Sequence, residues 1–266
     1  MAGPTNPETL SVLVGRGPVS QQRLAARLAT GSTDTWTELH NIDFTGVPVE
    51  DWTASGGTGS KAFGGVTLAW GNGTNCSTFG PDGSTGLRWL QNATGTVESG
   101  TSPYLQAALS NWGTWTDGQA LLVQLHWSNV ATTGNFSSFG SYIGLGADYV
   151  FVGGVYRSGV WRPSGICDPA QYTQTNTEVL TSSNGVIQML YTAAGASIYD
   201  AGTWSGAFPT ALVDSDLVEA IGTPSGTAKT LLSPVLSSAT MGIATYRSTS
   251  VTDLTIHRMW VGQRQL

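Results

Sequence analysis

Charge is scarce in this chain of 266 residues. Asp, Glu, Lys and Arg make up 11% of it, against roughly 25% in ordinary soluble domains. Lysine occurs only at Lys61 and Lys229, and the formal net charge is -6. The sequence therefore has no basic stripe that could neutralise phosphates, which excludes nucleic-acid binding. Hydroxyl and amide groups must supply most of the surface polarity.

Long hydrophobic runs and export signals are also missing from the sequence. No apolar run approaches the roughly 20 residues of a membrane-spanning helix. The first residues, MAGPTNPETL, contain neither the basic nor the apolar segment of a signal peptide. We therefore expect a soluble protein, made in the cytoplasm without a signal peptide and not inserted into a membrane.

Metal-binding motifs are equally rare. Cys76 and Cys167 lie far apart, so no CxxC pair exists; a single disulfide is one alternative, and two free thiols are the favoured one. We expect no metal and no cofactor, with calcium as the alternative, because calcium needs a cluster of Asp, Asn and carbonyl oxygens. No EF-hand-like spacing joins the acidic loop residues that could supply it: Asp82, Asp117, Asp148 and Asp168.

The first 35 residues differ from the rest of the chain. Prolines and glycines interrupt them, and in the piece VSQQRLAARLATG Ser20 can cap a short helix that Gly31 can end. We predict that residues 1–35 form an N-terminal docking arm with one short helix, and that residues 36–266 form one domain. The apolar residues of the arm are Leu10, Val12, Val14, Leu24 and Leu28.

From Trp36 onward, short apolar segments with a two-residue period are separated by Gly, Asn, Ser and Asp. In QALLVQLHWSNV, for example, the apolar side chains alternate with Gln124 and His126. At least eight such strands, with only one or two weak helices, predict an all-β domain: a two-sheet antiparallel jelly-roll sandwich. Gly153 and Gly154 within one strand predict a bulge or a bend.

The closing segment VTDLTIHRMWVGQRQL is predicted to be a strand that continues almost to the last residue. Its natural partner is the first strand of the domain, WTELHNIDFTG, because the termini of a domain often lie close together. Strict alternation would place Leu254, Ile256 and Trp260 on one face, and His257 and Met259 on the other.

Two resemblances follow from these segments. NIDFTGVPVEDWTASGG, ALLVQLHWSNV with SYIGLGADYVFVGG, and TDLTIHRMWVG resemble the first, middle and last strands of the concanavalin A-like lectin/glucanase jelly roll, including its laminin-G-like branch. This resemblance covers about residues 36–266 and implies a back sheet that holds both terminal strands and a concave sheet that often binds glycan. In its Gly/Ser/Thr/Trp-rich, Lys-poor composition behind an arm, the chain is also similar to accessory proteins of tailed-phage particles, such as tail fibres, baseplate appendages and head decorations.

The glucanase branch of that jelly roll carries a Glu-x-Asp-x-(x)-Glu motif on one strand. The nearest match here is VDSDLVEA, in which Asp214 stands in place of the nucleophilic Glu and is followed by Asp216 and Glu219. The same residues can form a short helix that Asp214 caps, with Leu217 and Val218 facing inward. We favour the helix and expect no catalytic residue, with a jelly-roll glycoside hydrolase as the alternative.

The three histidines, His40, His126 and His257, are dispersed, and no Ser-His-Asp order or G-x-S-x-G elbow is evident. We expect ordinary sheet histidines. The alternative is a metal site at which His40 and His257 meet on the paired terminal strands.

Tryptophan is the most suggestive residue type, with ten copies. Sugars stack their C–H faces on indole, whose N–H remains a donor. Trp70, Trp127 and Trp260 lie in predicted strands, so we assign them to the core. The candidates for binding a glycan or a partner are flanked by Gly and Ser: Trp112, Trp115, Trp161 and Trp204. Packing under loops or at a subunit interface is the alternative for these four.

The sequence and both resemblances together predict a non-catalytic structural protein of a virus particle, a tail fibre, appendage or capsid decoration of a phage. Its lectin-like domain would bind host surface glycan, residues 1–35 would bind other virion proteins, and the chain would form a homo-oligomer, with a trimer guessed from the appendage likeness. A free-standing carbohydrate-binding module is the alternative, in which the arm would be dispensable.

Overall fold

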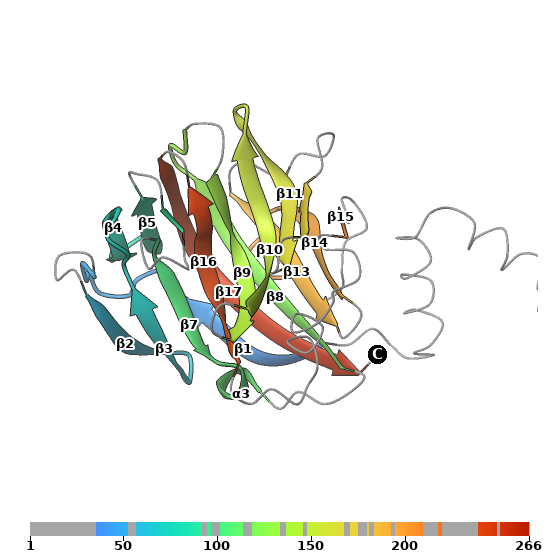
Figure 1. Ribbon diagram of the computed structural model, residues 1–266. Helices are drawn as coiled ribbons and strands as arrows, with labels where there is room; N and C mark the ends of the chain where they lie inside the picture. Colours follow the sequence, from blue (N-terminus) through green and yellow to red (C-terminus); the bar gives the residue numbers. More distant parts are fainter. Residues whose placement is uncertain are drawn as a thin grey trace, which may run out of the picture.

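The structure is a computed structural model that describes residues 36–52, 57–91, 95–96, 102–113, 119–133, 137–145, 148–167, 171–174, 180, 184–192, 195–209, 218–219, 239–248 and 251–265. In these residues it consists of antiparallel strands in two sheets and one short helix, α3 (Leu109–Trp112) (Figure 1). The all-β, two-sheet fold is thus confirmed. The predicted arm, with Leu10, Val12, Val14, Leu24 and Leu28, lies outside the described residues.

The sheet that contains the closing strand is called here the β17 sheet. Its order is β15-β14-β13-β8-β17-β5-β4, and β1 pairs with β17 as well. The strands are β1 (Thr37–Asp43), β4 (Cys76–Pro81), β5 (Leu87–Gln91), β8 (Gln119–Asn129), β13 (Gly185–Thr192), β14 (Gly195–Thr203), β15 (Val218–Glu219) and β17 (Thr252–Gln265).

The opposite sheet is called the β10 sheet. Its order is β12-β11-β10-β9-β16-β7-β3-β2, and the short β6 pairs with β16. The strands are β2 (Thr58–Phe63), β3 (Val66–Gly71), β6 (Gly95–Thr96), β7 (Tyr104–Ala108), β9 (Ser137–Leu145), β10 (Asp148–Arg157), β11 (Val160–Cys167), β12 (Gln171–Gln174) and β16 (Thr240–Ser248).

The two terminal strands lie side by side, which confirms the predicted pairing (Figure 1). β1 pairs antiparallel with the second half of β17, from Thr37 opposite Gln263 to Asp43 opposite Arg258. The other edge of β17 pairs with β8 from Leu254 to Gln265. Neighbours on both edges hold the closing strand, since each interior strand satisfies the backbone donors and acceptors of the next.

The alternation expected for β17 is wrong in its second half, because the register against β8 shifts between Ile256 and Arg258. The extra residue, His257, leaves two successive side chains on one face, as β-bulges do. Leu254 and Ile256 face the core before the shift, and Met259 and Val261 face it afterwards. Trp260 therefore points away from the core, where its Nε1 donates to Glu38 Oε2 at 2.6 Å.

A chain of aromatic rings runs through the core between the sheets, among many aliphatic side chains. Phe79 packs edge-to-face on Trp89 at 4.7 Å between ring centroids, and Trp89 packs on Phe139 at 5.6 Å. Trp127 continues the chain from Phe139, and Trp161 follows in a T-shaped contact at 5.2 Å. Most of the tryptophans are thus used for packing, which large rings do well because each buries much apolar area.

Gly140 on β9 and Gly153 on β10 are paired, and the β9–β10 register runs through them without a shift. A Cβ on Gly153 would lie 2.3 Å from the Phe139 carbonyl oxygen and 2.6 Å from the Gly140 Cα. The strands therefore approach each other at this point more closely than side chains permit, which is a known use of glycine within a sheet. The predicted bulge is wrong, because β10 pairs with both β9 and β11 without a register shift, and the bend stays a prediction.

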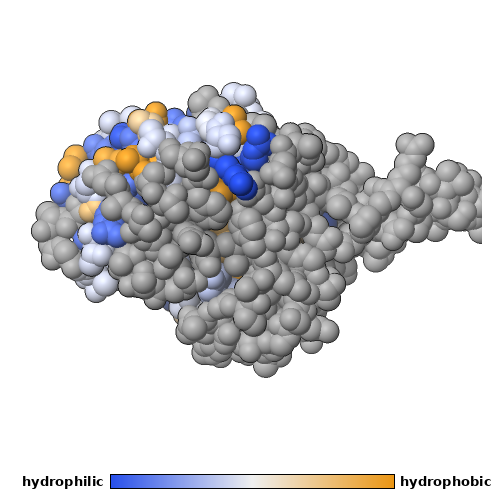
Figure 2. Space-filling model, turned by 45° about the horizontal axis from the view of Figure 1, so that its top comes forward, coloured by the Kyte–Doolittle hydropathy of each residue, from blue (hydrophilic) through white to orange (hydrophobic). Residues whose placement is uncertain are grey.

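The described part of the surface is mixed in polarity. Figure 2 shows small apolar areas interspersed with polar ones on the coloured atoms of the face in view. The large hydrophobic side chains exposed on the described residues are Val49 and Val130, at 72% and 47%. Within this part of the chain, no helix is long and apolar enough to cross a membrane. A binding site here must therefore combine aromatic and polar groups.

Candidate functional site

Of the four tryptophan candidates, the structure buries Trp112 and Trp161, each 1% exposed. Trp112 ends α3 and donates its Nε1–H to the Met241 carbonyl oxygen at 3.1 Å, while Trp161 packs on Trp127. The prediction that these two rings are exposed is wrong. Small Gly and Ser neighbours in the sequence do not keep a ring at the surface when strands from elsewhere in the chain pack around it. The packing alternative describes both. Trp115 lies outside the described residues.

Among the three described candidates, Trp204 is the one that stays partly exposed. It begins a segment, residues 204–209, that follows β14 and crosses the outer face of the β17 sheet. At its start the Trp204 N–H donates to the Asn184 carbonyl oxygen at 2.9 Å. At its end the Pro209 carbonyl oxygen accepts from Gln124 Nε2 of β8 at 3.0 Å. Both anchors fix the segment, and with it the indole, over the sheet.

The indole of Trp204 is the centre of what we call the Trp204 cluster, formed by Trp204, Phe208, Arg258, Asp43 and Asn41. Phe208 packs edge-to-face on Trp204 at 5.0 Å. The guanidinium carbon of Arg258 lies 5.7 Å from the Trp204 ring centroid and 5.9 Å from that of Phe208, within cation–π range. Arg258 also donates to Asn41 Oδ1 at 3.3 Å.

Asp43 supplies a carboxylate at the edge of the cluster. Its Oδ2 lies 3.8 Å from Arg258 Nε, and its Oδ1 accepts from the Thr45 N–H at 2.9 Å and the Thr45 hydroxyl at 2.6 Å. The side chain of Asp43 is 49% exposed and that of Arg258 is 28% exposed. An exposed pair at this distance contributes little to stability. Both groups therefore remain available to hydroxyl groups of a ligand.

Two imidazoles lie beneath the cluster. His126 stacks on Trp204 at 4.2 Å between ring centroids, and His257 lies 4.5 Å from His126. His126 Nε2 contacts Asn184 Oδ1 at 2.6 Å, and its buried Nδ1 has no hydrogen-bond partner. Burial lowers the pKa of His126 to about 4, and the nearby charges of His257 and Arg258 act in the same direction. His126 is therefore neutral at physiological pH.

The alternative prediction, that His40 and His257 meet on the paired terminal strands, is wrong. His40 pairs with Val261 in the β1–β17 ladder and turns to α3, where its ring packs on Trp112 at 5.7 Å. His257 meets His126 instead, across the β8–β17 register shift. Among the described residues, no group of three or more His, Cys, Asp or Glu side chains could hold a metal ion.

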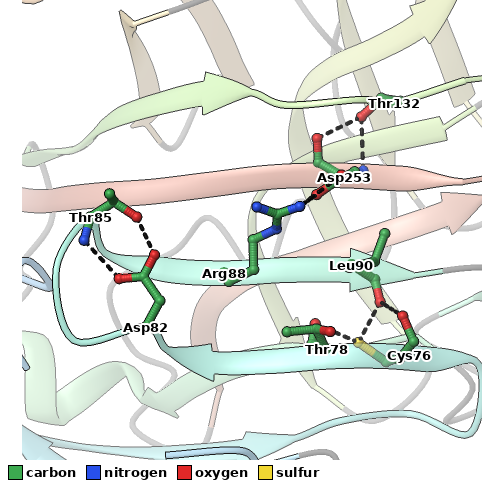
Figure 3. A network of polar contacts seen from close by, with 9 residues as sticks. Cys76, Thr78, Asp82, Thr85, Arg88, Leu90, Thr132 and Asp253 are labelled. Atoms are coloured by element: carbon green, nitrogen blue, oxygen red, sulfur yellow. Dashed lines mark hydrogen bonds and ion pairs between the residues drawn. The ribbon is translucent and has the colours of Figure 1, made fainter. Parts of the chain in front are cut away.

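Asp82, one of the calcium candidates, builds a turn (Figure 3). Its Oδ1 accepts the backbone N–H groups of Ser84, Thr85 and Gly86 at 3.0, 2.7 and 3.0 Å. Burial acts to raise the pKa of Asp82, but the hydrogen bonds from Thr85, Gly86 and Ser84 outweigh it and lower the pKa to about 2. Of the other candidates, Asp148 begins β10, and Asp117 and Asp168 lie outside the described residues.

Cys76 is a free thiol on the edge strand β4. The carbonyl oxygens of Thr78 and Leu90 lie 3.3 and 3.2 Å from its Sγ and share its single S–H donor (Figure 3). Burial raises the pKa of Cys76 to about 12. The thiol is therefore protonated and unreactive at neutral pH. Cys167 ends β11.

The helix expected around Asp214 is wrong for Val218 and Glu219. These two residues form β15, which pairs with Ser197 and Ile198 of β14. Pairing with a sheet edge overrides the local helical pattern, as tertiary context often does. Asp214 and Asp216 lie outside the described residues, so the glycoside hydrolase alternative stays a prediction.

No family model matches the chain, and no curated protein matches its sequence. Solved structures that resemble it include the CBM2 module of the evolved Dit of Lactobacillus casei BL23 phage J-1, at 12% identity and a TM-score of 0.47, covering 87% of this chain and 97% of that one. Protein SO2946 of unknown function from Shewanella oneidensis MR-1 has 11% identity, a TM-score of 0.48 and coverages of 100% and 97%.

Trypanosoma rangeli sialidase also resembles the chain, at 13% identity and a TM-score of 0.43, with 88% of this chain covered. The chain spans about a third of the length of that sialidase, of which 31% is covered. Every one of these TM-scores is below 0.5, so we transfer no activity, ligand or partner from these proteins.

Sequence reasoning found Trp204 but missed its neighbours. Phe208 lies four residues after Trp204, a signal that was available in TWSGAFP. Asp43 and Arg258 carried no such signal, because they meet through the β1–β17 register. The pairing of the terminal strands was predicted, but the register shift that turns Arg258 outward was not.

Proposed function

We propose that the chain is a recognition protein that binds, and does not cut, the polysaccharide chain of a cell-surface glycan. One observation carries this proposal: a partly exposed indole lies beside a second aromatic ring, with a guanidinium and a carboxylate at its edge. Sugar-binding sites need an aromatic face for the C–H groups and polar groups for the hydroxyls. The Trp204 cluster supplies both.

The charges of the cluster favour a neutral sugar. Arg258 contributes one positive charge and Asp43 one negative charge, while His126 is neutral. Glu38, which accepts from Trp260 Nε1, adds a second carboxylate nearby on β1. This excess of carboxylates would repel a polyanion. Adjacent hydroxyl groups of a neutral hexose can instead donate to Asp43 and accept from Arg258.

The virion setting belongs to the same proposal. In this proposal the chain is a structural protein of a phage particle, and residues 1–35 attach it to other virion proteins. The sandwich reaches the host glycan as a homo-oligomer, which we propose to be a trimer. The low charge supports an assembly role, because subunits then pack without desolvating many ions. A free-standing carbohydrate-binding module is the second candidate, and deletion of residues 1–35 distinguishes them.

The test is binding of the full chain to a panel of neutral and acidic bacterial surface polysaccharides, scored in parallel for released sugar. We expect binding to neutral members without release. Release of sugar would favour the hydrolase alternative at Asp214, Asp216 and Glu219. Absence of binding across the panel would contradict the recognition function.

A further inference from the structure

A serine and a histidine lie in hydrogen-bond contact beside the Trp204 cluster. Ser128 Oγ on β8 is 2.8 Å from His257 Nε2 on β17. Both side chains are partly exposed, and both point to the outer face of the β17 sheet. A hydroxyl within this distance of an imidazole nitrogen is the first requirement for an activated serine nucleophile.

The second ring nitrogen of His257 is held by the backbone. His257 Nδ1 lies 2.5 Å from the Thr85 carbonyl oxygen. A carbonyl oxygen only accepts, so Nδ1 carries the proton in the neutral ring and Nε2 presents its lone pair to the Ser128 hydroxyl. The carbonyl thus orients the imidazole of His257, as the carboxylate does in the Ser-His-Asp arrangement.

The Thr85 carbonyl is itself fixed. Asp82 binds the N–H groups of the turn (Figure 3), and the next residue, Gly86, has a φ of +146°. A Cβ on Gly86 would lie 2.3 Å from the Ile256 carbonyl oxygen, so the glycine lets the turn approach β17 at its register shift. Fixed supporting groups of this kind are what a catalytic pair needs for its geometry.

The register shift also supplies a positive charge. Because His257 is the extra residue in β17, His257 and Arg258 project from the same face. Arg258 Nε is buried without a hydrogen-bond partner, 3.8 Å from Asp43 Oδ2, while 28% of the Arg258 side chain is exposed. A guanidinium next to the pair is suited to stabilise the oxyanion that forms when a hydroxyl adds to a carbonyl.

We propose that Ser128 and His257 form a nucleophile–base pair that hydrolyses carboxylic esters. Ser128 Oγ attacks the carbonyl carbon while its proton passes to His257 Nε2. The tetrahedral oxyanion collapses, the bond from the carbonyl carbon to the alkoxy oxygen breaks, and the departing alcohol takes the proton from His257. Water then attacks the acyl-Ser128 ester, His257 again accepts the proton, and the carboxylic acid leaves as Ser128 recovers its hydrogen.

The natural substrate class is an O-acylated sugar, and this assignment of the substrate rests on the proposed glycan binding. The Trp204 cluster and the pair share the outer face of the β17 sheet, with His126 in contact with both rings, Trp204 and His257. A sugar held at Trp204 therefore places its acyl ester near Ser128. The polysaccharide chain itself stays uncut.

The experiment is labelling of the purified full chain with a fluorophosphonate probe, followed by peptide mapping. We expect an adduct on Ser128, no adduct in Ser128→Ala, and a labelling rate lower by on the order of 100-fold in His257→Gln, which removes the base. Ser77→Ala, at a strand serine whose hydroxyl donates to the Leu90 carbonyl oxygen, should label like the unchanged chain. The probe needs no glycan binding, so its result is independent of the proposed function.

Thermal unfolding of each variant shows that it is folded before it is scored. An unlabelled but folded wild-type chain would overturn the pair as a nucleophile. So would an adduct elsewhere with Ser128 unmodified, or equal labelling of wild type and His257→Gln. Release of acetate from an acetylated polysaccharide, lost in Ser128→Ala, would extend the result to the natural substrate class.

Discussion

Two groups of tryptophans in this molecule have opposite surroundings. Trp89 is fully buried, contacts Phe79 and Phe139, and donates its Nε1–H to Thr245 Oγ1 at 2.7 Å. Trp204 lies over the outer face of the β17 sheet, partly exposed, with a histidine beneath it and an arginine nearby. The comparison shows that most of the described tryptophans serve to fill the core. A binding role is expected for a ring that contacts charged and titratable groups, as Trp204 does.

The largest effect is expected in the aromatic chain. Trp89→Ala should lower the free energy of unfolding by about 3–5 kcal/mol, because it removes a large buried ring and leaves a cavity between the sheets. Urea titration followed by circular dichroism measures this loss. If the loss were below about 1 kcal/mol, the aromatic chain would not be the main support of the core.

A smaller loss is expected where the β9 and β10 backbones approach each other. Gly153→Ala should cost about 1–3 kcal/mol, because the new Cβ meets the Phe139 carbonyl oxygen and neither strand has room to move. Gly46→Ala is the comparison variant, which isolates backbone strain: its φ of +71° is strained for alanine, as that of Gly153 is not, and no atom lies within 4 Å of the new Cβ. Unchanged stability of Gly153→Ala would show that the two strands have room for a Cβ.

Because of the imidazole of His126 beneath Trp204, we expect the free energy of unfolding to depend on pH, by on the order of 1–2 kcal/mol. His126 has a pKa of about 4 in the folded chain, below its ordinary value of 6.5, mainly because of burial; the charges of His257 and Arg258 lower the pKa further, while Asn184 and Asp43 act to raise it. Below pH 6.5 the unfolded chain binds a proton that the folded chain does not, so stability falls between pH 6.5 and 4. Above pH 6.5 this contribution is complete.

His126→Gln should remove that part of the dependence while keeping an amide in place of the ring. The free energies of unfolding at pH 7, 5.5 and 4.5 give the slope for each protein. An unchanged slope in His126→Gln would mean that another group titrates there.

The sequence was sufficient to predict the strand segments and the pairing of the termini, because both follow from backbone periodicity and chain closure. β8 shows its limit: Leu121 and Trp127 face the core as predicted, but Gln124, on the opposite face, is fully buried as well. Burial of the second face depends on what crosses it, here the segment anchored at Pro209.

The candidate site was predictable only in part, for a similar reason. Trp204 could be proposed from its Gly and Ser neighbours, but the same local signal pointed to Trp112 and Trp161, which reach the core. The contacts of Ser128 with His257, and of Arg258 with Trp204, depend on one extra residue in β17. No local pattern in HRMW marks that bulge, because the bulge is defined by how β17 pairs with β8 and not by the residues of β17 alone.

The most direct test of the Trp204 cluster compares two arginine–indole pairs. Trp36 also lies under an arginine, Arg264, at 4.8 Å, and is partly buried like Trp204. We expect Trp204→Ala to weaken binding of the full chain to its preferred neutral polysaccharide at least about tenfold, equivalent to 1.4 kcal/mol, with little change in thermal unfolding, and Trp36→Ala to bind normally. Equal affinity of wild type and Trp204→Ala would contradict the account.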